Sequence, residues 1–225
     1  MKHLSIAFSI ILLSIFSCIK DDYVEDFVEP VLRIISTVDT IGIDESFQFE
    51  AMYLNNVGLE EEVSLQWFSS TPEVLSISTN DGLAQALQEG SAIISVKYNV
   101  GSLSLEAFME VNVGAETVSN ITERMGTVAS TSSYQLMGDF LLKEDGNGLI
   151  LELSDNYAAS TALPGLFVYL SNNKNSIGNA FEIASVVTFS GAHTYTIPNI
   201  GINDYSYLLY FCKPFNVKVG DGEIL

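Results

Sequence analysis

Apolar and polar residues alternate with a period of two through most of the chain, and this pattern constrains the fold most. The alternation is clearest over residues 47–53, 63–67, 92–98 and 103–113, with Asn-Asn, Asn-Asp-Gly and Glu-Gly turns between these segments. A period of two places apolar side chains on one face of a strand, and such turns join antiparallel strands. We therefore expect an all-β protein with helix limited to the first residues and to short turns.

The alternation stops over residues 115–132, which are rich in Ser, Thr and Gly, and resumes from Ser133. The chain has 225 residues, enough for two small domains. We expect two tandem β-sandwich domains, at residues 31–114 and 133–225, joined by residues 115–132. Within that connection Thr122-Glu123-Arg124-Met125 is consistent with a helical turn. In the second domain, Asp145-Gly146-Asn147-Gly148 predicts a hairpin turn.

The composition excludes two classes of protein. An apolar fraction of 48% is too high for a disordered chain. With 9 Lys and Arg against 28 Asp and Glu, the formal net charge is −19. Such a surface repels phosphate backbones, so we expect no nucleic-acid partner.

The first 18 residues have the features of an export signal. A short basic start precedes an apolar run from Leu4 to Phe16, which is too short to span a bilayer. The run ends in Ile15-Phe16-Ser17-Cys18, which resembles a bacterial lipobox, although Phe16 is bulkier than the usual residue. The resemblance implies a signal peptide over residues 1–17 and a lipid on Cys18 that anchors the protein to a membrane. An ordinary signal peptide that contains a cysteine remains the alternative.

The residues after Cys18 bear on location. Lys20, Asp21 and Asp22 resemble the export tag that sends some Gram-negative lipoproteins to the outer face of the outer membrane. Residues 18–30 are acidic and end at Pro30, so we interpret them as a tether. We expect an outer-membrane, lipid-anchored protein that is exposed at the cell surface.

The first domain resembles a known family. The sequence contains Leu65-Gln66-Trp67-Phe68-Ser69-Ser70-Thr71-Pro72-Glu73-Val74, then Asp81-Gly82-Leu83-Ala84, then Glu89-Gly90-Ser91-Ala92-Ile93-Ile94. In this order the segments resemble the group-two bacterial immunoglobulin-like domain, over about residues 31–114. The resemblance implies a spacer or adhesion module without chemistry of its own. We expect Trp67 to fill the core between the sheets rather than to act as a ligand platform.

The second domain also resembles a family. The relevant segments are Gly138-Asp139-Phe140, residues 149–153, Pro164 to Ser171, Gly191 to Pro198, and Tyr210-Phe211-Cys212-Lys213-Pro214-Phe215-Asn216-Val217. Over residues 133–225 they resemble the extracellular "DM thirteen" domain, which is proposed to act in cell-surface electron transfer through its single cysteine. Here Phe211 replaces the usual tryptophan, and Leu163-Pro164-Gly165-Leu166 lacks an acid of the family pattern.

Cys212 is the residue that this resemblance singles out as a redox candidate. It shares a strand face with Leu208 and Tyr210, while Leu209 and Phe211 point the other way. Since it lies directly before Lys213-Pro214, where strand pairing must break, we expect its sulfur to be partly exposed at the rim of the domain. Lys213 points to the opposite face. The alternative is a buried cysteine that acts as a small core residue.

The remaining motifs support no catalytic or metal site. His193 is the only histidine after residue 17, and one His with one Cys cannot supply a tetrahedral zinc site without two carboxylates. We expect an exposed strand histidine, with a haem held by Cys212 and His193 or a methionine as an open alternative. No nucleophile elbow or phosphate loop is present, and the turn at residues 145–148 lacks the later acids of a calcium loop.

Two functions follow from the sequence. The first is a surface electron-transfer module that uses Cys212, with no cofactor or with a haem-like prosthetic group. The second is a non-catalytic adhesion or ligand-binding protein that keeps Cys212 in its core. The sequence leaves enzymatic activity open and favours a protein that is not an enzyme in its own right. The expected partners are the membrane, through the lipid anchor, and a surface protein or glycan.

Overall fold

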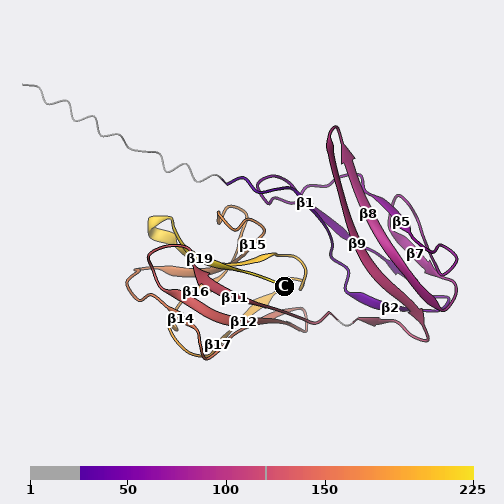
Figure 1. Ribbon diagram of the computed structural model, residues 1–225. Coiled ribbons are helices and arrows are strands. Elements are labelled where there is room, and N and C mark those ends of the chain that lie inside the picture. Colours follow the sequence, from indigo (N-terminus) through magenta and orange to yellow (C-terminus); the bar gives the residue numbers. More distant parts are fainter. Residues whose placement is uncertain (1–25, 120) are drawn as a thin grey trace, which may run out of the picture.

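The computed structural model describes residues 26–119 and 121–225 (Figure 1). These residues form two β-domains, and their one helical element is the short 3-10 turn η1 (Lys213–Phe215). The all-β prediction is therefore confirmed. Over the same residues, no helix has the length and apolar character needed to cross a membrane. The predicted signal peptide, lipidated Cys18 and export tag at Lys20, Asp21 and Asp22 lie outside the described residues.

The first domain packs two larger sheets around one apolar core. A five-stranded sheet has the order β10-β2-β9-β8-β5, a three-stranded sheet has the order β3-β7-β6, and β1 pairs with β4. The strands are β1 (Val31–Ile34), β2 (Val38–Gly42), β3 (Ser46–Gln48), β4 (Ala51–Leu54), β5 (Gln66–Ser69), β6 (Leu75–Ile77), β7 (Leu83–Ala86), β8 (Gly90–Val100), β9 (Leu103–Gly114) and β10 (Val118–Ser119).

Trp67 lies in the core of this domain, as predicted. It is 3% exposed, and its ring lies 6.0 Å from that of Phe49. Gly82, at the turn before β7, has a φ of +74°, and a Cβ there would come within 2.9 Å of the indole. Glycine is thus required at this turn both for the left-handed backbone and for the close approach of the tryptophan.

The second domain is one nine-stranded sheet that folds over on itself. Its order is β16-β15-β18-β19-β11-β12-β13-β17, with β14 paired to β12, and the end strands β16 and β17 contact each other. The elements are β11 (Glu123–Ser130), β12 (Leu136–Asp145), β13 (Gly148–Leu153), β14 (Ala158–Ala159), β15 (Leu166–Ser171), β16 (Phe181–Ser185), β17 (His193–Pro198), β18 (Tyr207–Cys212), η1 and β19 (Val217–Glu223). The predicted hairpin turn is confirmed, because Asp145 pairs with Gly148 across Gly146-Asn147.

Most of the segment predicted to connect the domains belongs to strands. β10 pairs with β2, and β11 pairs with β12 and β19. The predicted helical turn at residues 122–125 is wrong, because β11 begins at Glu123. The inward positions of β11 are Arg124, Gly126 and Val128, of which only the last is a large apolar residue. The period-two signal is therefore weak in this strand.

Candidate functional site

Cys212 is sealed in the core of the second domain. It ends β18, where it pairs with Leu166 of β15 and Val217 of β19, and it is 0% exposed. The predicted partial exposure of its sulfur is therefore wrong. Backbone pairing continues past the cysteine, since Lys213 N donates to the Gly165 carbonyl at 3.1 Å.

The proline that was expected to open the rim instead helps to close it. Pro214 lies in η1, beyond the last paired residue, so its missing N–H removes no ladder hydrogen bond. Its ring packs closely on Gly165, where an added Cβ would come within 2.9 Å of the ring. The chain therefore covers the end of β18.

The predicted orientation of the side chains on β18 is confirmed. Leu208, Tyr210 and Cys212 belong to the inner core, while Leu209 and Phe211 form a small outer cluster with Tyr169. Both faces of this strand are thus covered, which explains why even its end is inaccessible.

Lys213 points away from the thiol, as expected. Its Nζ lies 2.7 Å from a carboxylate oxygen of Glu182 and 5.1 Å from the centre of the Phe167 ring, on the outer face of the sheet. The ammonium lowers the pKa of Glu182 below its ordinary value, chiefly by this hydrogen bond. The charge of Lys213 therefore acts on Glu182 and not on Cys212.

The residues around Cys212 do not fit a haem-like group. Tyr210 and Phe211 are buried in different clusters, and Phe215 is 65% exposed, so the three aromatic rings do not line a common cavity. A haem iron bound by this sulfur would require the macrocycle to replace packed core side chains. In the part of the chain that the structure describes, no group of three or more His, Cys, Asp or Glu side chains is placed to hold a metal ion.

His193 is half-buried, so the prediction of an exposed strand histidine is wrong. Its Nδ1 lies 2.9 Å from the Gly191 carbonyl oxygen. Its ring packs edge-on against Tyr157 and Tyr195, with ring centres 4.8 and 5.3 Å away. The histidine is therefore part of an aromatic cluster in the core and is not presented to solvent as a ligand.

The contact between the two domains is a feature that the sequence did not reveal. Arg33 of β1 reaches into the second domain, where its guanidinium donates to Ser206 Oγ at 2.8 Å, Asn172 Oδ1 at 3.2 Å and the Asp204 carbonyl at 3.0 Å. Burial lowers the pKa of Arg33, and the negative charge of Asp204 opposes that shift. We call this contact region the domain junction.

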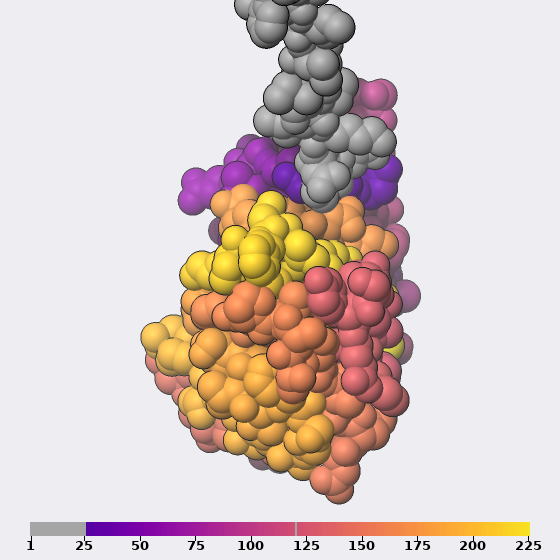
Figure 2. Space-filling view, turned by 90° about the vertical axis from the view of Figure 1, so that its left-hand side faces the viewer, coloured from indigo at the N-terminus to yellow at the C-terminus, as the bar shows by residue number. Residues whose placement is uncertain are grey.

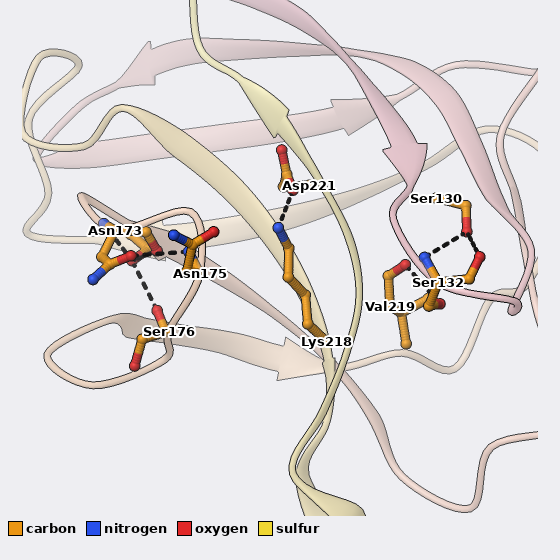
Figure 3. A network of polar contacts seen from close by, with 9 residues as sticks. Ser130, Ser132, Asn173, Asn175, Ser176, Lys218, Val219 and Asp221 are labelled. Carbon is orange, nitrogen blue, oxygen red and sulfur yellow. Dashed lines mark hydrogen bonds and ion pairs between the residues drawn. The ribbon is translucent and has the colours of Figure 1, made fainter. Parts of the chain in front are cut away.

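A loop of the second domain completes the domain junction. The loop after β15 is shaped by its own polar groups: Asn175 N donates to Asn173 Oδ1 at 2.9 Å (Figure 3), and Ser171 Oγ donates to the Asn173 carbonyl at 2.8 Å. This arrangement directs Asn173 Nδ2 at two carbonyl oxygens, that of Asp26 in the segment before the first domain at 2.5 Å and that of Val57 in the first domain at 3.1 Å. Figure 2 shows the orange and yellow segments of the second domain beside the indigo start of the first.

Further polar contacts fix the relative positions of the domains. Asn203 Nδ2 donates to the Ile35 carbonyl at 3.0 Å, and its Oδ1 accepts from Arg124 at 2.7 Å. Gly58 has a φ of +75°, and a Cβ there would come within 2.9 Å of the Asn172 backbone. In the sequence, Asn172, Asn173 and Asn203 are visible only as polar residues of loops. Their role in the domain junction cannot be recognised there, because it depends on partners far away in the chain.

The outer face of the first domain carries an exposed apolar row. Phe68 of β5 lies beside Ser95 of β8, which lies beside Phe108 of β9. The two phenylalanines are 41% and 64% exposed, and Ile93 on the same face is 49% exposed. This row could be recognised in the sequence, because Ile93 and Phe108 stand at positions where the regular alternation would place a polar residue. We call Phe68, Ile93 and Phe108 the apolar row.

Comparisons with known proteins identify no family. No protein-family model matches the chain, and no curated protein matches it. Similar solved structures include domains 5–6 of the S-layer protein SbsC, with a TM-score of 0.32 and 15% identity over 87% of this chain and 97% of that chain. Domains 4–9 of surface layer protein SbsC give a TM-score of 0.30 and 12% identity over 88% of this chain and 31% of that chain. A chimeric titin Z1Z2-Z1Z2 tandem gives a TM-score of 0.22 and 12% identity over 84% of this chain and 96% of that chain. Scores this low carry no argument, so both family resemblances stay predictions.

Proposed function

We propose that this chain is a non-catalytic binding protein of the cell surface, held at the outer membrane by a lipid on Cys18. The observation that carries the proposal is the apolar row, which exposes two phenylalanines across three strands of the first domain. Contiguous exposed apolar side chains bordered by polar residues are typical of interaction sites. The burial of Cys212 supports the proposal, because a redox role would require a sulfur that other molecules can reach.

The charges around the apolar row favour a partner that is not an anionic polymer. Lys97, which lies over the Phe68 ring at 5.5 Å, is paired with Glu106 at 2.8 Å. Glu110 lies opposite Ile93. The chain as a whole carries a formal charge of −19, so a surface protein or a neutral glycan suits this face better than a nucleic acid does.

Binding can be tested with a fragment of residues 26–225 that carries Phe68→Ser and Phe108→Ser. The fragment is incubated with intact cells and with immobilised neutral polysaccharides, and the retained protein is measured. We expect the double variant to lose most of the retention of the unchanged fragment. Val187→Ser in the second domain is a matched control, because Val187 is 78% exposed and lies outside the apolar row. Equal retention of all three proteins would contradict the proposed role of the apolar row.

The location can be tested separately. Cys18→Ser should move the protein from the membrane fraction to the soluble fraction, since the lipid is the proposed attachment. Display at the surface, which the resemblance at Lys20, Asp21 and Asp22 implies, is tested by adding protease to intact cells. Protection of the protein would place it on an inner leaflet and contradict surface display.

A redox role for Cys212 is the alternative, and the structure offers it little support. Thiol exchange requires access to the sulfur, and the sulfur is buried. A rapid reaction of the native thiol with a disulfide reagent, or a haem or flavin absorption band in the purified protein, would restore this alternative.

A further inference from the structure

Four polar atoms lie buried and without a hydrogen-bond partner in one cluster of the second domain. They are the hydroxyls of Tyr157, Tyr195 and Tyr210 and Nε2 of His193, and none has a partner among the residues that the structure describes. The rings touch in a chain, with centres 5.3 Å apart from Tyr195 to His193, 4.8 Å from His193 to Tyr157 and 6.0 Å from Tyr157 to Tyr210. Burying one such group unpaired is costly, so four together require a common explanation.

The cluster joins the two halves of the folded sheet. His193 and Tyr195 belong to β17, Tyr210 belongs to β18, and Tyr157 lies in the turn between β13 and β14. That turn comes close to β12 because Gly138 has a φ of +140° and no side chain, so that a Cβ there would meet Tyr157 Cα at 2.7 Å. The backbone thus brings Tyr157 between the two halves.

The donors and acceptors of the cluster are complementary. The Gly191 carbonyl can only accept a hydrogen bond, so Nδ1 of His193 is the donor, and Nε2 of the corresponding neutral tautomer would be an acceptor. Each tyrosine hydroxyl offers one proton and also accepts. The Tyr157 and Tyr210 hydroxyls lie close enough for each to affect the pKa of the other, but they form no hydrogen bond of regular geometry. A water in contact with both hydroxyls would give each of them a hydrogen-bond partner.

We propose that the second domain encloses an ordered water site between the Tyr157 and Tyr210 hydroxyls, linked to His193 Nε2 and Tyr195. A buried water typically makes two to four hydrogen bonds, and this cluster offers four unpartnered polar atoms. The site would connect β17 to β18 through a polar network inside an otherwise apolar core. Such a network restricts the packing of the two halves, because any other arrangement leaves its members unpaired.

The decisive experiment is a high-resolution crystal structure of residues 26–225, together with water-to-protein NOE measurements on the tyrosine rings in solution. We expect density for a water within hydrogen-bond distance of both Tyr157 Oη and Tyr210 Oη, and a water NOE to at least one of these rings. A direct bond between the two hydroxyls with no water between them, or the absence of any water NOE, would overturn the proposal. Neither measurement needs a substitution, so the result does not depend on whether a variant folds.

A double-mutant cycle tests whether the hydroxyls act as one network. Tyr157→Phe and Tyr210→Phe should each raise the unfolding equilibrium constant about five-fold, the usual effect of one lost hydrogen bond. If the water links them, the double variant should stay well below the roughly 25-fold product expected for independent changes. Tyr169→Phe is the control, because its hydroxyl bonds Glu182 on the outer face, and its effect should multiply with that of Tyr157→Phe. A full product for the Tyr157 and Tyr210 pair would contradict the network.

Discussion

Arg33 is the residue whose removal should most affect the relation between the two domains. It makes three hydrogen bonds across the domain junction, at 2.8, 3.0 and 3.2 Å. A hydrogen bond to a charged group typically contributes about 1.5–3 kcal/mol to stability. Two effects reduce the sum. The guanidinium is largely buried, and no carboxylate among the described residues forms an ion pair with it, so its lost hydration costs several kcal/mol. Its acceptors also keep other partners.

Those other partners can be named. Asn172 Oδ1 also accepts from Ser206 N at 3.1 Å, and the Asp204 carbonyl also accepts from Asn172 Nδ2 at 2.8 Å. Because these acceptors remain bonded, we expect Arg33→Ala to lower the free energy of unfolding by about 2 kcal/mol, which is less than the sum of the contributions of three separate hydrogen bonds. Arg33→Met, which keeps an unbranched side chain opposite Met52 on β4 and removes the buried charge, should cost less.

Calorimetry measures the number of unfolding transitions, and small-angle X-ray scattering measures the distribution of interdomain distances. We expect the unchanged protein to unfold in one transition, and Arg33→Ala to unfold in two with a broader distribution of interdomain distances. Lys97→Ala is the control, because Lys97 is a half-exposed cation of the same domain whose ion pair with Glu106 contributes at most about 1 kcal/mol. Two separate transitions in the unchanged protein, or no change in scattering for Arg33→Ala, would refute the reasoning.

Two further predictions concern buried groups of the second domain, and a third concerns glycine turns of the first domain. The thiol of Cys212 should react with a disulfide reagent only at the rate at which the domain opens, so the rate should rise steeply with added denaturant; a fast reaction in the native protein would contradict its burial. Burial raises the pKa of Tyr210 well above its ordinary value and that of Tyr169 to about 12; their protonated forms therefore stabilise the fold fully below pH of about 10, and stability should fall as the pH rises above that value. Absorbance at 295 nm should show tyrosines that ionise only on unfolding, and complete titration without unfolding would be the contrary result. Gly58→Ala should destabilise the protein by more than Gly101→Ala in thermal melts, because both have positive φ but only Gly58 would also clash with the second domain.

The sequence predicted the fold well where its alternation was regular. The outward and inward positions of β8 and β9 follow directly from the pattern of their residues, and so does the burial of Trp67. The prediction failed for β11, whose inward positions include Arg124 and Gly126. Arg124 bonds Asn203 and Gly126 makes room for Phe140, and neither reason is visible without the neighbouring strands.

The exposure of Cys212 could not be predicted for a related physical reason. A position at the end of a strand lies at the rim only if nothing covers the strand end. Here η1 packs Pro214 on Gly165, and a second apolar cluster around Tyr169 covers the outer face of β18. Both contacts join residues at least 40 positions apart, so they arise from the topology rather than from the local pattern. The domain junction escaped prediction because its polar side chains stand in loops without any periodicity.

The hydrogen bonds that hold the start of the first domain set a limit on how far the protein reaches. Asn173 binds the Asp26 carbonyl, and Val28 N donates to the Asn56 carbonyl at 2.8 Å, so the described chain is held firmly from its first residues. Eight residue steps separate Cys18 from Asp26, and they can extend over no more than roughly 29 Å. With Cys18 as the lipidated residue, the domain junction would lie within about that distance of the bilayer surface. A protein tethered in this way samples the layer of molecules next to its own membrane, and a distant partner must approach that layer to be bound.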